Sequence, residues 1–285
     1  MSSTFLNQVQ TIAYLGPGGS YTEMAKDIFC EKYELNLNLK PLDSIKRVLD
    51  FVDENPDSVG VLPIENSIEG GVRQTIDNLI RTKNENIKIL SEVVMPIQHC
   101  LLSRTTEIYS ITGVISHPQA LAQCQNFIHN ELPLNLNIIE VASTAEAARS
   151  LQNYNLTYAA IGSKKTAEIY NLNVLKDNIN DEPDNQTRFA LIGDFETPTT
   201  AKDITSLAFS TENKPGALLN VLQIFHDYGI NLSYIDSRPS KTKFGEYTFF
   251  VDFDGHITDE TILKAIEEIK THTQYYRLIG SFERF

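Results

Sequence analysis

Glu65, Asn66 and Ser67 stand just beyond an apolar run, Val59 to Leu62. The run predicts a buried strand, so a carboxylate, a carboxamide and a hydroxyl would follow one another near the strand's carboxyl end. Gly70-Gly71 comes next, ahead of a helical pattern, and glycine lets a backbone approach a ligand closely. Open α/β sheets form ligand crevices from a strand, a polar turn and a helix in this order. We therefore expect chemistry at this turn; the alternative is a solvated loop acid beside a turn residue.

A glycine turn near the N-terminus offers a second candidate site. Gly16-Pro-Gly-Gly19 follows an expected strand over Gln10–Leu15 and precedes Ser20-Tyr-Thr-Glu23, whose spacing is that of a capping box. Backbone N–H groups at the positive end of a helix dipole suit a carboxylate or a phosphate. The spacing is not a dinucleotide fingerprint, and the lysine of a P-loop is missing, so a nucleotide is disfavoured. A plain tight turn remains the alternative.

Two more expected strands lead into helices through polar residues. Ser116 closes a strand before a helix that begins at Pro118, and Ser143-Thr144 opens another capping-box spacing. Gln123 lies off the apolar line of the first of these helices, where it points either into a crevice or to solvent, and its local pattern favours solvent. Four strand-to-helix corners thus carry hydroxyls, amides or glycines. Their repetition predicts one shared crevice.

A hydroxyl and a fixed cation stand side by side at Thr187 and Arg188, ahead of the apolar strand Phe189–Ile192. A planar guanidinium that is always charged is well suited to holding a carboxylate. The alternative is a surface loop with a salt-bridged arginine.

The rest of the pattern divides the chain. Asp194–Asp203 is polar and rich in proline and threonine, so we place a domain boundary there. Before it, strands and helices alternate as in α/β proteins, and the β-rich run Ile87–Leu102, interrupted by Pro96, is expected to cross between two lobes. After it, the periodicities predict the ferredoxin-like order βαββαβ.

Composition excludes several classes of function. The 285 residues carry 37 acidic and 24 basic side chains, a net charge of −13, and no basic stripe, which argues against binding to nucleic acid or an anionic membrane. No secretion signal or membrane-length apolar run is present, so we expect a cytoplasmic protein. Cys30, Cys100 and Cys124 form an odd set without C-x-x-C spacing, which suggests neither a disulfide framework nor a zinc site.

Five motifs occur in a fixed order: Gly16-Pro-Gly-Gly-Ser-Tyr, Pro63-Ile-Glu-Asn-Ser-Ile-Glu-Gly, Ser116-His-Pro-Gln-Ala-Leu-Ala-Gln-Cys, Ser143-Thr-Ala-Glu-Ala-Ala and Asn185-Gln-Thr-Arg-Phe. Together they resemble prephenate dehydratase followed by an ACT regulatory domain. The resemblance covers nearly the whole chain and begins directly at the dehydratase part, as in the monofunctional form. It implies a catalytic α/β domain over residues 1–194 with two lobes similar to type II periplasmic binding proteins. Lobe one would span about 1–86 and 183–194, lobe two about 87–182, and the ACT domain 204–285.

The resemblance also implies an activity: decarboxylative dehydration of prephenate to phenylpyruvate, in phenylalanine synthesis, without a metal or organic cofactor. Because the product is aromatic, orientation and protonation of the substrate should suffice. Catalytic positions are implied for Thr187, Glu65, Asn66, Ser116 and Gln123. We expect Thr187 to donate a hydrogen bond to the leaving hydroxyl, and Glu65 to be the acid only if burial raises its pKa. Substrate binding is expected of Arg188, Phe189, Gly18, Gly19, Ser20, Ser143 and Thr144.

Regulation is implied by the ACT resemblance. Phenylalanine would bind at an interface between subunits of a homodimer or homotetramer formed through the ACT and catalytic domains. The matching positions are Asn213, Pro215, Gly216, Ala217 and Leu218, with Asp236, Ser237, Arg238 and Pro239. Asp236 stands where the family usually has glutamate, which leaves the strength of feedback open, and Ser20 keeps the hydroxyl of the more frequent threonine. We expect removal of the chain from about Ala201 to leave a folded, uninhibited dehydratase.

Two other functions stay open. Arogenate dehydratase uses the same motifs on the amino-acid analogue of prephenate. A non-catalytic solute-binding or sensor protein would share a two-lobed fold, but it has no need for both a Thr-Arg and a Glu-Asn pair and usually carries an export signal.

Overall fold

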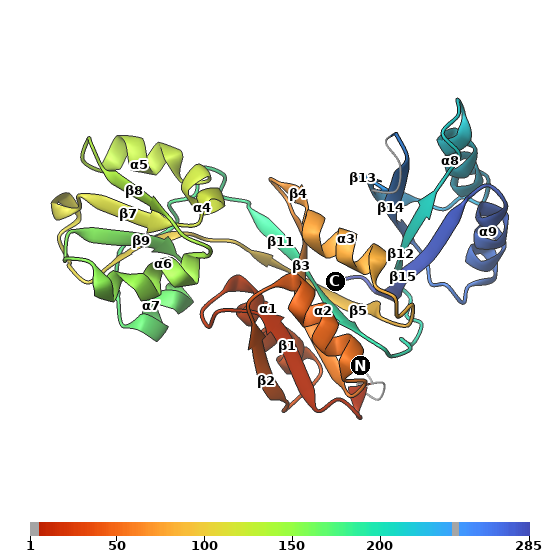
Figure 1. Cartoon of the computed structure of the whole chain (residues 1–285), viewed down its shortest axis with the longest axis horizontal. Helices are drawn as coiled ribbons and strands as arrows, with labels where there is room; N and C mark the ends of the chain where they lie inside the picture. The colour runs from red at the N-terminus through yellow and green to blue at the C-terminus, as the bar shows by residue number, and fades with distance from the viewer. Residues whose placement is uncertain (1–5, 241–244) are drawn as a thin grey trace.

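Three parts follow one another along the molecule, a small α/β lobe, a larger α/β lobe and a C-terminal α/β part (Figure 1). The computed structural model describes residues 6–240 and 245–285. Among these residues, no helix combines the length and the apolar character that a membrane span requires.

In the larger lobe, the strand expected over Val59–Leu62 continues to Asn66, so Glu65 and Asn66 lie in the strand and not in a turn after it. The strands of this lobe are β1 (Thr11–Leu15), β2 (Asn38–Leu42), β3 (Ser58–Asn66), β4 (Gly70–Gly71), β5 (Lys88–Pro96) and β11 (Gln186–Gly193), and its helices are α1 (Tyr21–Lys32), α2 (Ile45–Glu54) and α3 (Arg73–Arg81). Helix α1 begins where the capping-box spacing predicts, since the Ser20 side chain accepts a hydrogen bond from Glu23 N–H. Helix α2 buries one face, Val48, Leu49 and Val52 included, against the sheet.

The smaller lobe has its own five-stranded sheet in the order β10-β6-β9-β7-β8. Its elements are β6 (Cys100–Ser103), η2 (Ile108–Ser110), β7 (Gly113–Ser116), α4 (Pro118–Ala122), α5 (Gln125–Glu131), β8 (Asn137–Glu140), α6 (Thr144–Ser150), η3 (Leu151–Asn153), β9 (Tyr158–Gly162), α7 (Lys164–Tyr170) and β10 (Asn173–Lys176). Two segments connect it to the larger lobe, and they are hydrogen-bonded to each other: Ile97 N–H donates to the Asn185 carbonyl at 2.8 Å, and Ile179 N–H to the His99 carbonyl at 3.0 Å. Such a paired connection is a natural hinge between lobes.

The boundary between the lobes differs from the expected one at residue 87. Strand β5 pairs along its length with β11, from Gln186↔Pro96 to Gly193↔Lys88, and so belongs to the larger lobe. The β-rich run 87–102 does cross between the lobes, but the crossing lies after Pro96, where the pairing with β11 stops. The position of the crossing depends on the pairing of β5 with β11, which is distant in sequence and so is not visible in a local pattern.

The C-terminal part has the expected βαββαβ order. It comprises β12 (Asp203–Ser210), α8 (Ala217–Asp227), β13 (Leu232–Pro239), β14 (Tyr247–Asp254), α9 (Glu260–Thr271) and β15 (Tyr275–Glu283). Its sheet is continuous with that of the larger lobe, because β15 pairs with β5 at Gly280↔Ile89. A side chain at position 280 would collide with the Ile89 carbonyl, so the junction needs glycine. The resulting ten-stranded sheet has the order β13-β14-β12-β15-β5-β11-β3-β1-β2, with β4 beside β3.

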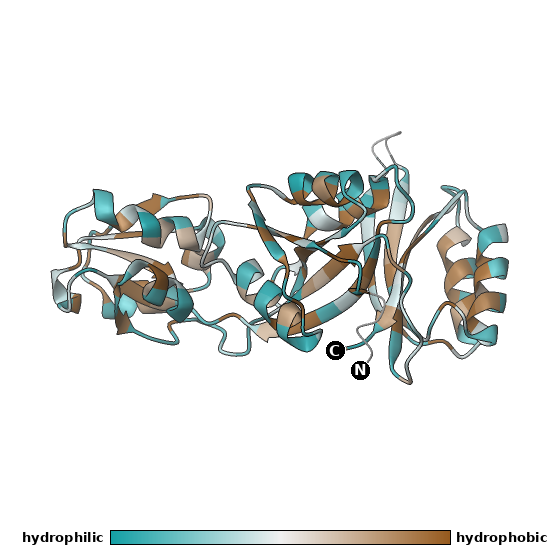
Figure 2. Ribbon diagram, turned by 90° about the horizontal axis from the view of Figure 1, so that it is seen from below, coloured by the Kyte–Doolittle hydropathy of each residue, from teal (hydrophilic) through white to brown (hydrophobic). Residues whose placement is uncertain are grey.

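A shared apolar core joins the C-terminal part to the larger lobe. Ile204, Phe250 and Phe282 lie in the same buried cluster as Ile76 and Ile89. Figure 2 shows apolar residues concentrated along the strands of this sheet. The C-terminal part also has a core of its own, with Leu207, Val221 and Ile266 among its residues, so the polar linker joins two parts that share one core and keep others separate.

Candidate active site

A cavity of about 350 Å³ lies between the two lobes. All four strand-to-helix corners contribute to its wall, through Ser20, Asn66, His117 and Ser143-Thr144. The expectation of one shared crevice is thus confirmed. Thr187, Phe189 and Gln123 also line it. The cavity is large enough for a small organic ligand.

Asn66 and Thr187 meet at one wall of this cavity. They lie opposite each other on the antiparallel strands β3 and β11, and Asn66 Nδ2 donates to Thr187 Oγ1 at 2.9 Å. Asn66 Oδ1 in turn accepts from the N–H groups of Ile68 and Glu69, both at 3.1 Å, which fixes the orientation of the amide. Because the Thr187 oxygen already accepts a hydrogen bond, its own proton is available to a molecule in the cavity.

Gln123 comes from the smaller lobe and is buried, so the local interpretation that it points to solvent is wrong. Its Oε1 accepts from Asn185 Nδ2 at 3.1 Å and lies 3.2 Å from His99 Nε2. Asn185 Oδ1 accepts from Asn66 Nδ2 at 2.8 Å, so one polar network links the lobes. Gln123 Nε2 is buried without a hydrogen-bond partner among the described residues. A buried amide N–H group that faces a cavity is a donor for a ligand.

His99 and Tyr21 also line the cavity, and sequence reasoning did not identify them as site residues. The Tyr21 hydroxyl lies 3.2 Å from His99 Nδ1. Burial lowers the pKa of His99 to about 4, so its ring is neutral at pH 7 and can donate from Nε2 to Gln123. The sequence signal for His99 as a site residue is weak: it stands directly next to the expected strand that includes Cys100–Ser103, and other strand ends near the cavity also carry polar residues.

The cavity wall carries no Lys, Arg, Asp or Glu side chain among the described residues. Burial also lowers the pKa of His117, which favours its neutral form. A ligand carboxylate in this cavity would therefore be held by hydroxyls, amides and backbone N–H groups. Such neutral donors, fixed in a low-dielectric site, can stabilise negative charge strongly.

Glu65 and Arg188 differ from their predicted positions, because neither lines the cavity. Successive side chains of a strand point to opposite faces, so Asn66 and Thr187 face the cavity while their neighbours face the C-terminal part. Arg188 forms ion pairs there with Glu65, Glu92 and Asp252. Burial raises the pKa of Glu65, as its predicted role as an acid required, but its carboxyl group is on the wrong side of the sheet.

Ser116, Gly18 and Gly19 are also absent from the cavity wall. The Ser116 hydroxyl is buried and donates to the Ile161 carbonyl at 2.9 Å. Gly19 N–H, expected to hold a carboxylate of a ligand, donates to the Glu23 carboxylate of its own helix at 2.6 Å. The Gly19 carbonyl accepts from Thr166 Oγ1 at 2.8 Å, so this turn contacts the smaller lobe instead.

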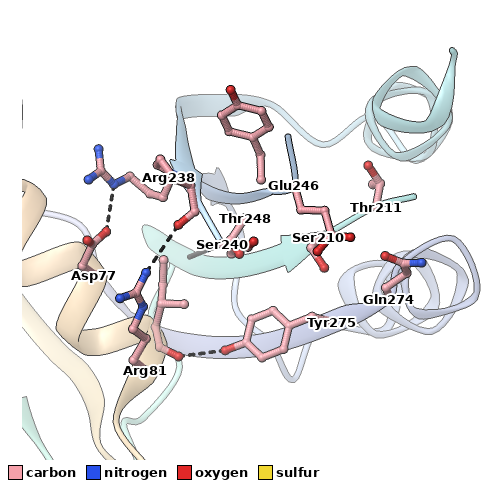
Figure 3. A pocket seen from close by; sticks show the side chains of 13 residues that line it. Asp77, Arg81, Ser210, Thr211, Arg238, Ser240, Glu246, Thr248, Gln274 and Tyr275 are labelled. Atoms are coloured by element: carbon pink, nitrogen blue, oxygen red, sulfur yellow. Dashed lines mark hydrogen bonds and ion pairs between the residues drawn. The ribbon is translucent and has the colours of Figure 1, made fainter. Parts of the chain in front are cut away.

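The expected regulatory residues fall into two groups. Asn213, Pro215, Gly216, Ala217 and Leu218 lie at the start of α8, where Gly216 adopts a left-handed conformation with φ of 82°. Asp236, Ser237, Arg238 and Pro239 lie in the edge strand β13. Arg238 and Pro239 line a second cavity of about 260 Å³ between α3 and the strand ends of the C-terminal part, and no residue of the first group lines it (Figure 3). This cavity therefore brings in the second group without the first.

No group of three or more His, Cys, Asp or Glu residues in the described ranges is arranged to hold a metal ion.

Comparisons with known proteins agree with the fold and the motifs. The family model "Prephenate dehydratase" matches residues 12–197, and the model "ACT domain" matches 205–271. A prephenate dehydratase of Methanocaldococcus jannaschii is 39% identical over 281 residues, which cover 97% of this chain and 99% of that protein. The Arabidopsis thaliana protein named arogenate dehydratase/prephenate dehydratase 2, chloroplastic, is 35% identical over 284 residues, 95% of this chain and 72% of its own. A solved prephenate dehydratase from Arthrobacter aurescens in complex with L-Phe superposes with a TM-score of 0.85 at 32% identity, covering 96% of this chain and 90% of that one.

Proposed function

Because this chain belongs to the prephenate dehydratase family, we propose that its interlobe cavity converts prephenate into phenylpyruvate, carbon dioxide and water. The reaction expels a ring hydroxyl while a carboxylate leaves as carbon dioxide, and the ring becomes aromatic. The enzyme's main tasks are to hold the substrate in the reactive geometry and to stabilise the departing oxygen.

Thr187 is the proposed donor to the leaving hydroxyl. A threonine hydroxyl is a poor acid, so it acts by donating a hydrogen bond rather than by losing its proton. The oxygen then leaves as hydroxide and takes from the solvent the proton that completes the water molecule. Asn66 makes this donor effective, since its amide occupies an acceptor site of Thr187 Oγ1 at 2.9 Å and so directs the hydroxyl proton elsewhere. The Asn66–Thr187 pair at the cavity wall is the observation that supports this proposal most.

The substrate's carboxylates would be bound by neutral donors. Gln123 Nε2 is such a donor, because it is buried and has no hydrogen-bond partner among the described residues. Ser20, Ser143 and Thr144 supply hydroxyls and backbone N–H groups at helix starts. These donors come from both lobes, so a closed arrangement of the lobes is needed to complete the site. Phe189 would contact the ring.

Turnover assays with purified chain test this proposal. Prephenate should yield phenylpyruvate and one equivalent of carbon dioxide, and arogenate, assayed in parallel, tests the alternative suggested by the plant relative. A folded protein that turns over neither compound would reject both. Calorimetric binding of an amino acid without turnover would favour a sensor protein instead.

Feedback control by L-phenylalanine is part of the same proposal. Its support is the ACT match over residues 205–271 and the L-Phe complex of the related Arthrobacter aurescens protein. Strand β13 is an edge strand, and Ile235 on it and Leu219 on α8 are exposed apolar side chains. We propose that a second copy covers this edge in a homodimer or homotetramer, which would bring the α8 start of one subunit to β13 of the other. The free cysteines Cys30, Cys100 and Cys124 fit a reducing compartment such as the cytoplasm.

A further inference from the structure

A buried ionic cluster, hereafter the Arg188 cluster, joins the catalytic sheet to the C-terminal part. It consists of Arg188 with Glu65, Glu92 and Asp252. Arg188 Nη2 lies 2.6 Å from Asp252 Oδ2, whereas its contacts to Glu92 and Glu65 are longer, at 3.5 and 3.4 Å. Asp252 is fully buried. The strongest partner of Arg188 therefore belongs to the regulatory part of the chain, not to the catalytic one.

The cluster holds more negative than positive charge. Three carboxylates surround one guanidinium, and burial raises the pKa of both Glu92 and Glu65 although Arg188 opposes the shift. Asp252 is fixed by a second hydrogen bond, because Ser206 Oγ donates to its Oδ1 at 2.5 Å. Removing either Arg188 or Asp252 would leave a buried charge without its main partner.

The cluster also lies one residue away from the proposed donor. Thr187 precedes Arg188 on β11, and Asn66 follows Glu65 on β3, so each strand presents one residue to the cavity and its neighbour to the C-terminal part. Tyr234 of β13 adds a further contact between Arg188 and the C-terminal part, because the centre of its ring lies 5.9 Å from the guanidinium carbon of Arg188. A side chain at Gly71 would collide with the Tyr234 hydroxyl, so this glycine admits the regulatory part rather than a ligand.

We propose that Arg188 is a positioning residue whose ion pair with Asp252 transmits movement of the C-terminal part to Thr187 and Asn66. A shift of β14, which carries Asp252, pulls on Arg188 and changes the alignment of β11 with β3. The distance between Thr187 and Asn66 then changes, and with it the direction of the donor proton. The inference rests on the proposed feedback by phenylalanine, and it places the coupling at one ion pair.

The variant Asp252→Asn tests the coupling, because it keeps the size of the side chain and the hydrogen bond from Ser206 but removes the charge. Glu283→Gln is the matched control, because it also removes a charge that pairs across the two parts. Glu283 of β15 lies 3.5 Å from Lys32 Nζ of α1, and neither residue lies on β3 or β11 or among the expected phenylalanine-binding positions. For each protein, calorimetry measures the dissociation constant of phenylalanine, and turnover of prephenate measures its inhibition.

We expect Asp252→Asn to bind phenylalanine with nearly the wild-type dissociation constant, while inhibition at saturating phenylalanine falls at least about fivefold. Glu283→Gln should remain inhibited like the wild type. Inhibition of folded Asp252→Asn at the wild-type level would overturn the proposal, as would an equal loss in Glu283→Gln. If Asp252→Asn does not fold, Ser206→Ala, which removes only the hydrogen bond that orients Asp252, is judged by the same outcomes. A wild-type chain that neither binds nor responds to phenylalanine would instead reject the proposed feedback itself.

Discussion

Asn66 and Thr187 lie directly opposite each other on two antiparallel strands, and the Asn66 amide donates a 2.9 Å hydrogen bond to the Thr187 hydroxyl. The pair stands on the cavity side of a sheet whose other side carries Glu65 and Arg188. The proposed donor Thr187 and its neighbour Arg188 are thus adjacent in sequence but lie on opposite faces of the sheet.

Thr187→Val is expected to lower kcat by roughly 10², because it removes a donor aimed at developing charge while keeping the volume of the side chain. KM for prephenate should change much less. Steady-state kinetics gives both values, and Thr187→Ser, which restores the hydroxyl, is the control. Near-normal turnover by folded Thr187→Val would show that the donor is another group.

Asn66→Asp is expected to lower kcat about as strongly as Thr187→Val. A carboxylate cannot donate, so the Thr187 hydroxyl would turn its proton toward the introduced carboxylate and away from the substrate. The double variant should be little worse than either single one, since both remove the same interaction. Additive losses in a double-mutant cycle would contradict this dependence.

Gln123→Glu is expected to raise KM for prephenate at least about tenfold with a smaller effect on kcat, because it replaces an unpartnered donor with an acceptor that repels a carboxylate. Gln119→Glu, which adds the same charge at another residue of the cavity wall, is the control for general repulsion. Equal increases in KM for the two variants would argue against a specific contact with Gln123.

His99 should make the free energy of unfolding depend on pH. Its pKa is about 4 in the folded protein and 6.5 in its ordinary state, so between these values the unfolded chain binds a proton that the folded one does not. The contribution of neutral His99 to the free energy of unfolding is therefore fully present above pH 6.5, and it is lost as the pH falls toward 4. At pH 5 the loss should be about 2 kcal/mol. Urea denaturation of wild type and His99→Gln at pH 7.5 and pH 5 should show their stability difference shrinking by that amount; a constant difference would mean that His99 is protonated when folded.

Removal of the chain from Ala201 onward is expected to destabilise the catalytic part, contrary to the interpretation from the linker sequence. The cut would expose Ile76 and Ile89, which lie in the shared apolar cluster, and would leave Arg188 without Asp252. Size-exclusion chromatography and a thermal melt of the truncated chain measure the effect. A monodisperse truncated chain that melts like the full one would show that the shared cluster is dispensable.

Local sequence patterns determined the elements and the chemical character of their corners. Ser20 and Ser143 cap helices at the expected residues because a capping side chain reaches a backbone N–H only three residues away. The βαββαβ order of the C-terminal part followed in the same way from periodicity. Four corners with hydroxyls, amides or glycines indicated one crevice, although two of them belong to the sheet of each lobe and meet because the lobes face each other.

Tertiary structure alone decided which side of each strand faces the crevice. Alternation places Glu65 and Asn66 on opposite faces, but it does not say which face the C-terminal part covers, because that depends on the pairing of β15 with β5. The same long-range pairing set the lobe boundary after Pro96 and assigned Arg188 to Asp252 rather than to a substrate. His99 and Gln123 entered the site from the segment between the lobes and from the smaller lobe, respectively, by hydrogen bonds between residues 24 positions apart. Such contacts depend on how distant elements fold together, and no local pattern contains that information.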